Sequence, residues 1–323
     1  PVVREDWARY YSRIGDLDAQ VGKVLTELEE DGLADDTNVL LFGDHGSGMP
    51  RSKREPYDSG LRVPMTIHVP ERFAHLAPDE YAEGGELGTR LVSFVDLAPT
   101  MLSLAGVEPP THLHGHAFAG EFEVPGPEFL YGYRDRMDER IDLSRVVCDG
   151  RWLLRRNYMP HRPYGQHIDY QFQTPTTRLW YERFLRGGLD ETQAAFWLPK
   201  PTIELYDLAT DPHETRNLLR DREHGARMRR LFNELRRFSL EIHDVGVIPE
   251  PARFDRAGES TPWDLGERLA GSGDLLETVR AASGAASLSS DEPAVRAWAA
   301  LGLGRGLGPY TFVDEDRALL EDA

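Results

Sequence analysis

A carboxylate and an imidazole follow directly after a short apolar segment. Residues Val39–Phe42 form an apolar run that predicts a buried strand, and Asp44 and His45 come after one intervening glycine. In an open α/β sheet, ligands bind beyond the carboxyl ends of the strands. The glycines around the pair allow close approach of the backbone. The pattern therefore predicts a site for a hard metal ion and an anionic group.

A cation for that anionic group comes from the same Gly-, Ser- and Pro-rich segment. Lys53 follows the Gly-Ser-Gly stretch at 46–48, and Arg51 and Arg54 flank it. Either arginine could equally be the reaching cation. We favour Lys53 because it comes after the most flexible part of the segment.

The composition indicates a globular protein with an acidic surface. The 323 residues leave room for about two domains, and 40% are hydrophobic and 28% charged. A formal charge of −18 argues against nucleic acid as the main partner. No apolar run approaches the roughly 20 residues that would cross a bilayer, so no membrane span is predicted. Because the chain starts at Pro1 without a signal-like segment, we expect a processed or truncated piece.

Hydrophobic periodicity predicts two folding units and a tail. Residues 1–120 contain two helical patterns and two short apolar strands, which favour βα units around a mainly parallel sheet. Residues 121–250 predict a smaller α+β domain with an antiparallel sheet and a closing helix, and Asp149-Gly150 is a strong hairpin signal. The expected helices span 7–33, 91–105 and 223–243, and the expected strands 39–42, 63–69, 129–134, 146–148, 152–155 and 203–208.

Two further segments have unusual composition. Residues 157–201 are rich in aromatic side chains but weakly periodic, which predicts a long ordered loop of the functional kind. Residues 251–323 shift to Ala, Gly, Leu and Ser, and 291–301 resemble the start of a HEAT-type helical repeat. Only one such unit is visible, so we expect a linker and a truncated HEAT-like helical region.

Ordered sequence blocks from about residue 16 to residue 249 resemble the sulfatase family of the alkaline-phosphatase superfamily. They are Leu17-Asp18, Gly32-Leu33, Asp44-His45-Gly46, Gly60-Leu61-Arg62-Val63-Pro64, Val95-Asp96-Leu97-Ala98-Pro99-Thr100, Glu204-Leu205-Tyr206-Asp207-Leu208 and Asp211-Pro212-His213-Glu214. The segment 46–50 and the aromatic middle are most similar to heparan N-sulfatase-like members. The resemblance implies an α/β fold: the C-terminal half of an alkaline-phosphatase-like domain, then the smaller α+β domain and the helical tail.

The resemblance implies roles for several side chains. Asp44 and His45 match the second pair of ligands for the calcium ion of the family, although many members carry Asn where this chain has His45. Lys53 matches the lysine that contacts the sulfate and its leaving oxygen. Arg134 and His161 lie where the smaller domain would face the site, and we expect them to bind an anionic sugar; a surface role is equally compatible. The turn ending at Glu214 is expected to be structural, without a catalytic role.

The chain departs from the family in one respect. Sulfatases use a formylglycine made from Cys or Ser in a C/S-x-P-x-R motif, preceded by an Asp-Asp metal pair, and both lie before the helix that begins this chain. The single cysteine, Cys148, excludes an internal disulfide and lacks the Pro of that motif, so we expect a small buried strand residue. Half of the site is therefore present, and we expect the chain alone to be inactive.

The predicted activity of the intact protein is hydrolysis of a sulfate ester or sulfamate in a sulfated small molecule or glycan, with calcium and formylglycine. A periplasmic or secreted location is what the resemblance implies, and the oligomeric state is left open. One alternative is a phosphodiesterase or phosphonate monoester hydrolase of the same superfamily. The other is a catalytically inactive binding or scaffold protein, motivated by the absent nucleophile and the repeat-like tail.

Overall fold

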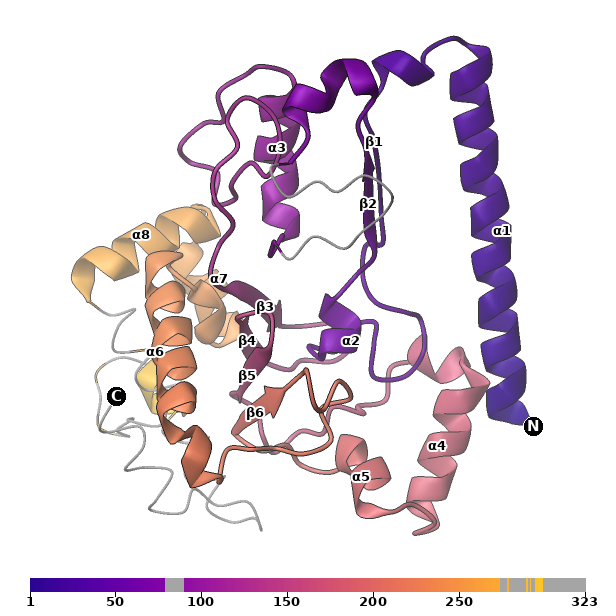
Figure 1. The fold of residues 1–323 in the computed structure, drawn as a ribbon. Helices are drawn as coiled ribbons and strands as arrows, with labels where there is room; N and C mark the ends of the chain where they lie inside the picture. Colours follow the sequence, from indigo (N-terminus) through magenta and orange to yellow (C-terminus); the bar gives the residue numbers. More distant parts are fainter. Residues whose placement is uncertain (79–89, 274–277, 279–288, 290, 292–293, 299–323) are drawn as a thin grey trace.

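The computed structural model describes residues 1–78, 90–273, 278, 289, 291 and 294–298. Within these ranges Figure 1 shows a long N-terminal helix beside a two-stranded pair, with a separate four-stranded sheet flanked by helices. The helices are α1 (Val2–Glu30), α2 (Asp58–Leu61), α3 (Leu97–Leu104), α4 (Pro175–Leu185), α5 (Glu191–Ala194), α6 (Gly225–Glu241), α7 (Glu250–Ala257) and α8 (Pro262–Ser272). The strands are β1 (Val39–Phe42), β2 (Met65–His68), β3 (Leu130–Arg134), β4 (Ser144–Cys148), β5 (Trp152–Asn157) and β6 (Ile203–Asp207).

The first helix forms as its apolar spacing predicts. It spans 29 residues, and Gly32 just beyond its end has the positive φ of +70° that a helix terminus favours. Near the start of the helix, Asp6 is hydrogen-bonded to α4. Its Oδ2 accepts hydrogen bonds from the backbone N–H and from the hydroxyl of Thr176, at 2.7 and 2.6 Å. The buried Asp6 thus caps the first turn of α4 and joins the two helices.

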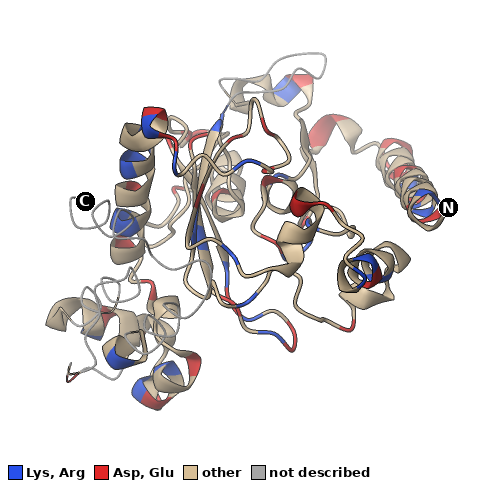
Figure 2. Ribbon diagram, turned by 90° about the horizontal axis from the view of Figure 1, so that it is seen from below, with Lys and Arg blue, Asp and Glu red and all other residues tan. Residues whose placement is uncertain are grey.

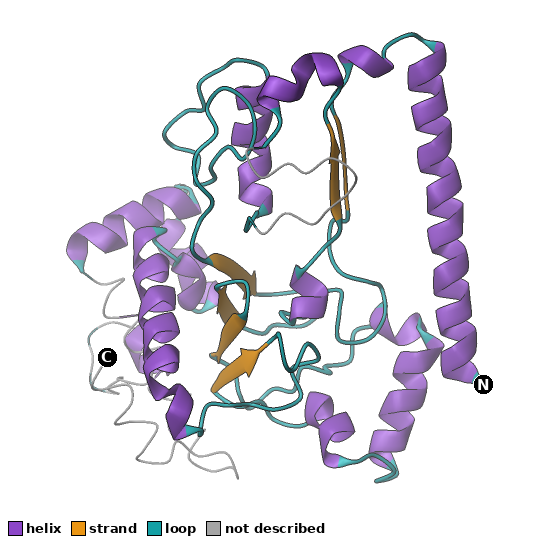
Figure 3. Cartoon of the chain, viewed as in Figure 1, coloured by secondary structure: helices purple, strands orange, loops and turns teal. Residues whose placement is uncertain are grey.

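The predicted parallel arrangement is wrong for the described strands, because β1 and β2 pair antiparallel (Figure 3). A parallel pair needs a crossover, usually through a full helix, whereas the link between these strands contains only the four-residue α2. The chain instead turns back beyond the end of β1, and Gly43 N–H donates to Pro64 O at 3.1 Å.

The prediction that β1 is buried is also wrong for part of the strand. The side chains of Leu41 and Phe42 are 44% and 42% exposed. Within the described part of the chain, no helix or sheet covers these two side chains of the two-stranded pair. The ring of Phe42 does contact that of Phe94, with 5.6 Å between the ring centroids. An apolar sequence shows that the side chains of a strand can be buried. Whether they are buried depends on another helix or sheet that packs on them.

The smaller domain has the predicted antiparallel sheet, in the order β3-β4-β5-β6. The hairpin at Asp149-Gly150 is confirmed, with φ of +89° at Gly150. Because side chains alternate along a strand, Val147, Leu154 and Leu205 pack on the apolar side of α6.

The opposite face of this sheet carries charge. Arg155 of β5, Glu204 of β6 and Arg134 of β3 are all buried there, facing the loop that follows β1. Figure 2 accordingly shows basic segments within the sheet as well as along the outer helix. Both faces of the sheet are thus covered, one by the apolar side of the amphipathic helix α6 and the other by the loop that follows β1.

The segment 157–201 is more regular than the predicted long loop, because it contains α4 and α5. Its aromatic residues supply a core of their own: Tyr164, Phe196 and Trp197 pack together and enclose Tyr57 from the loop after β1. The aromatic richness therefore reflects a small hydrophobic cluster that holds the first unit against the second.

The C-terminal region adds α7 and α8 against the smaller domain. Five of the eleven residues of the predicted HEAT-like unit at 291–301 lie outside the described residues. Of the others, Ala294, Val295 and Trp298 are buried beside Val247 and Leu265. None of the described helices combines the length and apolar character that crossing a membrane requires.

The apolar face of the sheet gives a first testable prediction. Leu205 is fully buried between β5, β6 and α6, so Leu205→Ala should lower the free energy of unfolding by about 2–5 kcal/mol through lost burial and a residual cavity. Urea denaturation measures this change. The matched control is Leu185→Ala at the end of α4, where the side chain is 65% exposed and a change within about 0.5 kcal/mol is expected. Equal losses in the two variants would contradict the described packing.

Candidate functional site

The candidate site is built on the loop between β1 and β2, which is closed on itself. Gly46 N–H donates to Gly60 O at 3.1 Å, and the Ser52 hydroxyl donates to Ser59 O at 2.5 Å. A Cβ atom at Gly46 would lie 1.9 Å from Ser59 O, so a side chain at this position would break the closure. The loop therefore presents its side chains from a tightly folded backbone.

Asp44 and His45 lie side by side at the start of this loop. Asp44 Oδ2 is 3.5 Å from His45 Nε2, and the carboxylate is 87% exposed. His45 Nδ1 lies 2.6 Å from Gly46 O, and since a carbonyl only accepts, Nδ1 carries the proton. The lone pair of Nε2 is then free and lies on the side of the carboxylate.

This donor pair fits a divalent cation. A carboxylate oxygen and an unprotonated ring nitrogen can both reach one ion at their observed separation, with the second nitrogen fixed by its hydrogen bond to Gly46 O. Oxygen ligands suit calcium best, so the imidazole is the less usual member of the pair. Two ligands are fewer than any metal site needs, and the others must come from outside Asp44 and His45.

Of the three neighbouring cations, Lys53 is the one left available by the described residues. Arg54 forms an ion pair with Asp138, and Arg51 Nη2 donates to the backbone carbonyl of His213 at 2.7 Å. Lys53 has no carboxylate partner among the described residues; its Nζ lies over the ring of Tyr170, 4.8 Å from the centroid. The role of Lys53 as the cation of the site stays a prediction, and Lys53 is the one of the three that the contacts of Arg51 and Arg54 leave for that role.

Tyr170 marks a rim beside Lys53 that the sequence did not predict. Its ring is 52% exposed and also lies 4.7 Å from the guanidinium carbon of Arg54. The aromatic composition of segment 157–201 was the available signal, but without periodicity it does not single out one ring.

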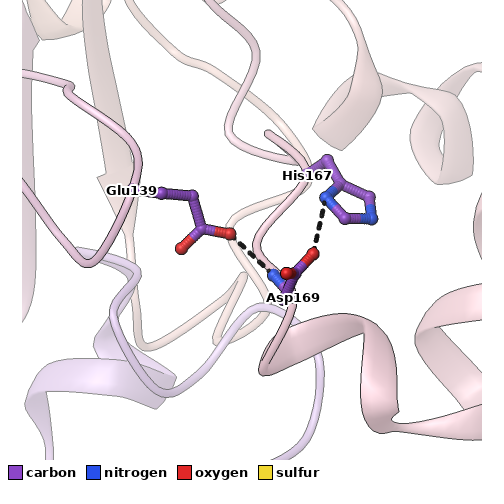
Figure 4. A group of neighbouring side chains, drawn as sticks. All are labelled: Glu139, His167 and Asp169. Atoms are coloured by element: carbon purple, nitrogen blue, oxygen red, sulfur yellow. Dashed lines mark hydrogen bonds and ion pairs between the residues drawn. The ribbon is translucent and has the colours of Figure 1, made fainter.

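Three exposed side chains, one of them on the residue that precedes Tyr170, lie close together in Figure 4: Glu139, His167 and Asp169. Their ligand atoms lie within 4.8 Å of one another, Glu139 Oε1 accepts from Asp169 N–H at 2.8 Å, and His167 Nδ1 is 3.5 Å from Asp169 Oδ1. The hydrogen bond to the Asp169 amide lowers the pKa of Glu139. The group offers acceptors for hydroxyl or amino hydrogens at the edge of the site.

The other predicted substrate contacts are placed differently. Arg134 was expected to bind substrate, but its side chain is completely buried and ion-paired with Glu55. It therefore has no surface that a substrate could contact. Arg136, two residues further along the chain, pairs with Glu250: Nε donates to Oε1 and Oε2 at 3.0 and 2.8 Å, and Nη2 donates to Oε2 at 2.5 Å. His161 is exposed, in the turn that follows β5.

Cys148 lies at the end of β4, as expected for a strand residue. Burial raises the pKa of its thiol to about 11, so the nucleophilic thiolate is scarce at neutral pH. This agrees with the sequence argument that Cys148 does not replace the missing nucleophile.

Residues 4–107 match the family model described as Sulfatase. Two curated relatives are an ulvan-active sulfatase of Formosa agariphila, 37% identical over 250 residues, and the human N-sulphoglucosamine sulphohydrolase, 27% identical over 266 residues. These matches cover 77% and 76% of this chain but only 40% and 50% of the relatives. The chain therefore spans half or less of the length of these relatives.

A solved structure of a 2-O GAG sulfatase supports the fold. It superimposes with a TM-score of 0.50 and 20% sequence identity, covering 71% of this chain and 41% of that chain. The predicted resemblance to sulfatases, with an N-sulphoglucosamine sulphohydrolase among the relatives, is thus confirmed by sequence and by fold. Residues 4–107 of this chain form a sulfatase-family segment, and similarity to a sulfatase extends over 77% of the chain.

Proposed function

We propose that this chain is part of a calcium- and formylglycine-dependent hydrolase that cleaves the sulfate ester or sulfamate of a sulfated saccharide. The observation that carries the proposal is one closed loop that presents a metal-donor pair, Asp44 and His45, together with the available cation Lys53. The names of two relatives, which refer to ulvan and to N-sulphoglucosamine, support a sulfated sugar as the substrate class.

The roles of the donor pair follow from their geometry. Asp44 and His45 would hold the calcium ion from one side, through a carboxylate oxygen and Nε2. A bound calcium ion would offset the charge of the sulfate, and a formylglycine made from a Cys or Ser outside these 323 residues would supply the nucleophile. The hydrogen bond from His45 Nδ1 to Gly46 O keeps the ring in the tautomer that leaves Nε2 free.

Lys53 would act on the other side of the sulfate. Negative charge develops on the departing oxygen or nitrogen as its bond to sulfur breaks, and an ammonium group close to that atom stabilises the charge. The exposed ring of Tyr170 next to Lys53 offers a flat apolar surface for a sugar ring, with Glu139 and Asp169 as hydrogen-bond acceptors at its edge.

Substitution of the metal donors tests the first half of this proposal in the intact protein. Asp44→Ala should lower kcat/KM for a sulfated substrate by at least roughly 100-fold and lower the bound calcium, because a charged ligand is lost. His45→Asn should retain most activity, since an amide oxygen is a good calcium ligand. The measurements are turnover of aryl sulfate and sulfated glycans, and calcium content by elemental analysis.

The same assay separates the alternatives. Faster turnover of aryl phosphates or phosphonates than of sulfates would replace the sulfatase proposal with the phosphohydrolase one. Unchanged activity and calcium content in Asp44→Ala would contradict the metal assignment.

Lys53 is tested by a charge deletion with a matched control. Lys53→Ala should reduce kcat by about 10²–10³-fold, the loss typical when one charge-stabilising group is removed from an active site. Lys23→Ala removes the same side chain from the exposed surface of α1 and should leave kcat unchanged. A substrate with a strongly acidic leaving group should lose less rate in Lys53→Ala, because it needs less assistance; an equal loss for all leaving groups would argue against this role.

A further inference from the structure

A side chain of the smaller domain reaches across to the loop that carries Lys53. We propose that Glu214 is a positioning residue: by holding the backbone at Pro56 and Asp58, it fixes the place of Lys53. The catalytic consequence rests on the proposed function, whereas the mechanical part stands on contacts within this chain.

One carboxylate oxygen of Glu214 binds the loop, and the other binds a buried arginine. Oε1 accepts a hydrogen bond from Asp58 N–H at 2.6 Å, and Oε2 forms an ion pair with Arg155. Nε and Nη2 of Arg155 in turn donate to Pro56 O at 3.0 and 2.8 Å. A carbonyl and an amide two residues apart in the loop are therefore both held by one buried ion pair of the smaller domain.

The loop is also held closer to Lys53. The carboxylate of Glu55 pairs with Arg134, and both side chains are fully buried. The ring of Tyr57 lies between two guanidinium groups, 4.3 Å from that of Arg51 and 4.4 Å from that of Arg155. The residues on both sides of Lys53 are thus anchored inward, while Lys53 itself extends to the ring of Tyr170.

The backbone shows the same constraint. Arg51 and Arg54 have positive φ values of 64° and 73°, which non-glycine residues rarely adopt, and Glu214 has φ of 50°. Such conformations persist only where the surroundings over-determine them. Two of these strained residues, Arg51 and Arg54, flank Lys53 in the loop. The third, Glu214, is the residue that holds the loop through Asp58.

The charges serve placement more than stability. Burial raises the pKa values of Glu55 and Glu214, and their arginine partners only partly reverse this effect. Removing these carboxylates from water is thus not fully offset by pairing, as is common for buried ion pairs. What the pairs provide is a fixed geometry, on which catalytic rates depend steeply.

Glu204 offers a matched control for the experiment. It is a buried carboxylate that also pairs with Arg155, at 3.1 Å, but its other contacts go to Asn157, Tyr164 and Tyr206 of the smaller domain. Glu204→Ala and Glu214→Ala therefore remove comparable buried charges, and only the second removes a direct contact with the loop.

The test combines kinetics of the intact protein with hydrogen exchange over residues 56–60. We expect Glu214→Ala to lower kcat by about 10–100-fold with little change in KM, because the loss is one of alignment. Exchange at Asp58 should accelerate at least about tenfold in Glu214→Ala and stay near the wild-type rate in Glu204→Ala. Glu214→Gln, which keeps an acceptor but not the charge, should fall between the wild type and Glu214→Ala in both readouts.

Two results would overturn the proposal: wild-type exchange at Asp58 in Glu214→Ala, or equal losses of kcat in Glu214→Ala and Glu204→Ala. If Glu214→Ala does not fold, Glu214→Leu decides, because it keeps a similar size without an acceptor, and unchanged protection of Asp58 in that variant contradicts the contact. Loss of protection in Glu214→Ala together with full activity in Lys53→Ala would leave the mechanical contact standing and refute the role of Lys53 instead.

Discussion

The buried guanidinium of Arg155 is the point on which the arrangement of this protein depends. It lies on the inner face of the four-stranded sheet, pairs with Glu204 and Glu214, and donates twice to the carbonyl of Pro56. A buried cation of this kind is costly unless every partner is in place. The sheet of the smaller domain, the turn after β6 that carries Glu214 and the loop after β1 must therefore assemble together, and the candidate site exists only in that assembled state.

Strand alternation explains how one sheet serves two purposes. On β5, Leu154 faces α6 and contributes to an apolar core, while the next residue, Arg155, faces the loop. On β6, Leu205 and Glu204 divide in the same way. The apolar side provides stability through burial, and the charged side provides the position of a loop that comes from the other unit of the chain.

The sequence predicted the helices and strands better than it predicted how they pair and what covers them. The first helix, the hairpin at Asp149-Gly150 and the strands of the smaller domain follow from local periodicity and turn chemistry, and the structure contains them. The limits are less exact, since α1 spans Val2–Glu30 where 7–33 was predicted. The antiparallel pairing of β1 with β2 and the exposure of Phe42 depend on which layers are present, and local pattern carries no information on that.

The candidate site divides along the same line. Asp44, His45 and Lys53 lie within one short segment, so their grouping could be predicted from sequence spacing. Tyr170 and Glu214 reach the same region from more than 100 residues further along the chain, and only the fold brings them there. The burial of Arg134 was unpredictable for the same reason, since its partner Glu55 belongs to the other unit.

The cap that Asp6 forms on α4 connects the first helix to a segment about 170 residues further along the chain. As a rigid rod of 29 residues, α1 extends about 44 Å from the segment leading into β1 to the start of α4, which follows Tyr170 within five residues. The start of β1, which leads to Asp44, and the segment that carries Tyr170 are therefore attached to opposite ends of one helix. Through Asp6 and Thr176, α1 thus links the start of β1 to the segment that carries Tyr170, without supplying any of the side chains proposed for the site.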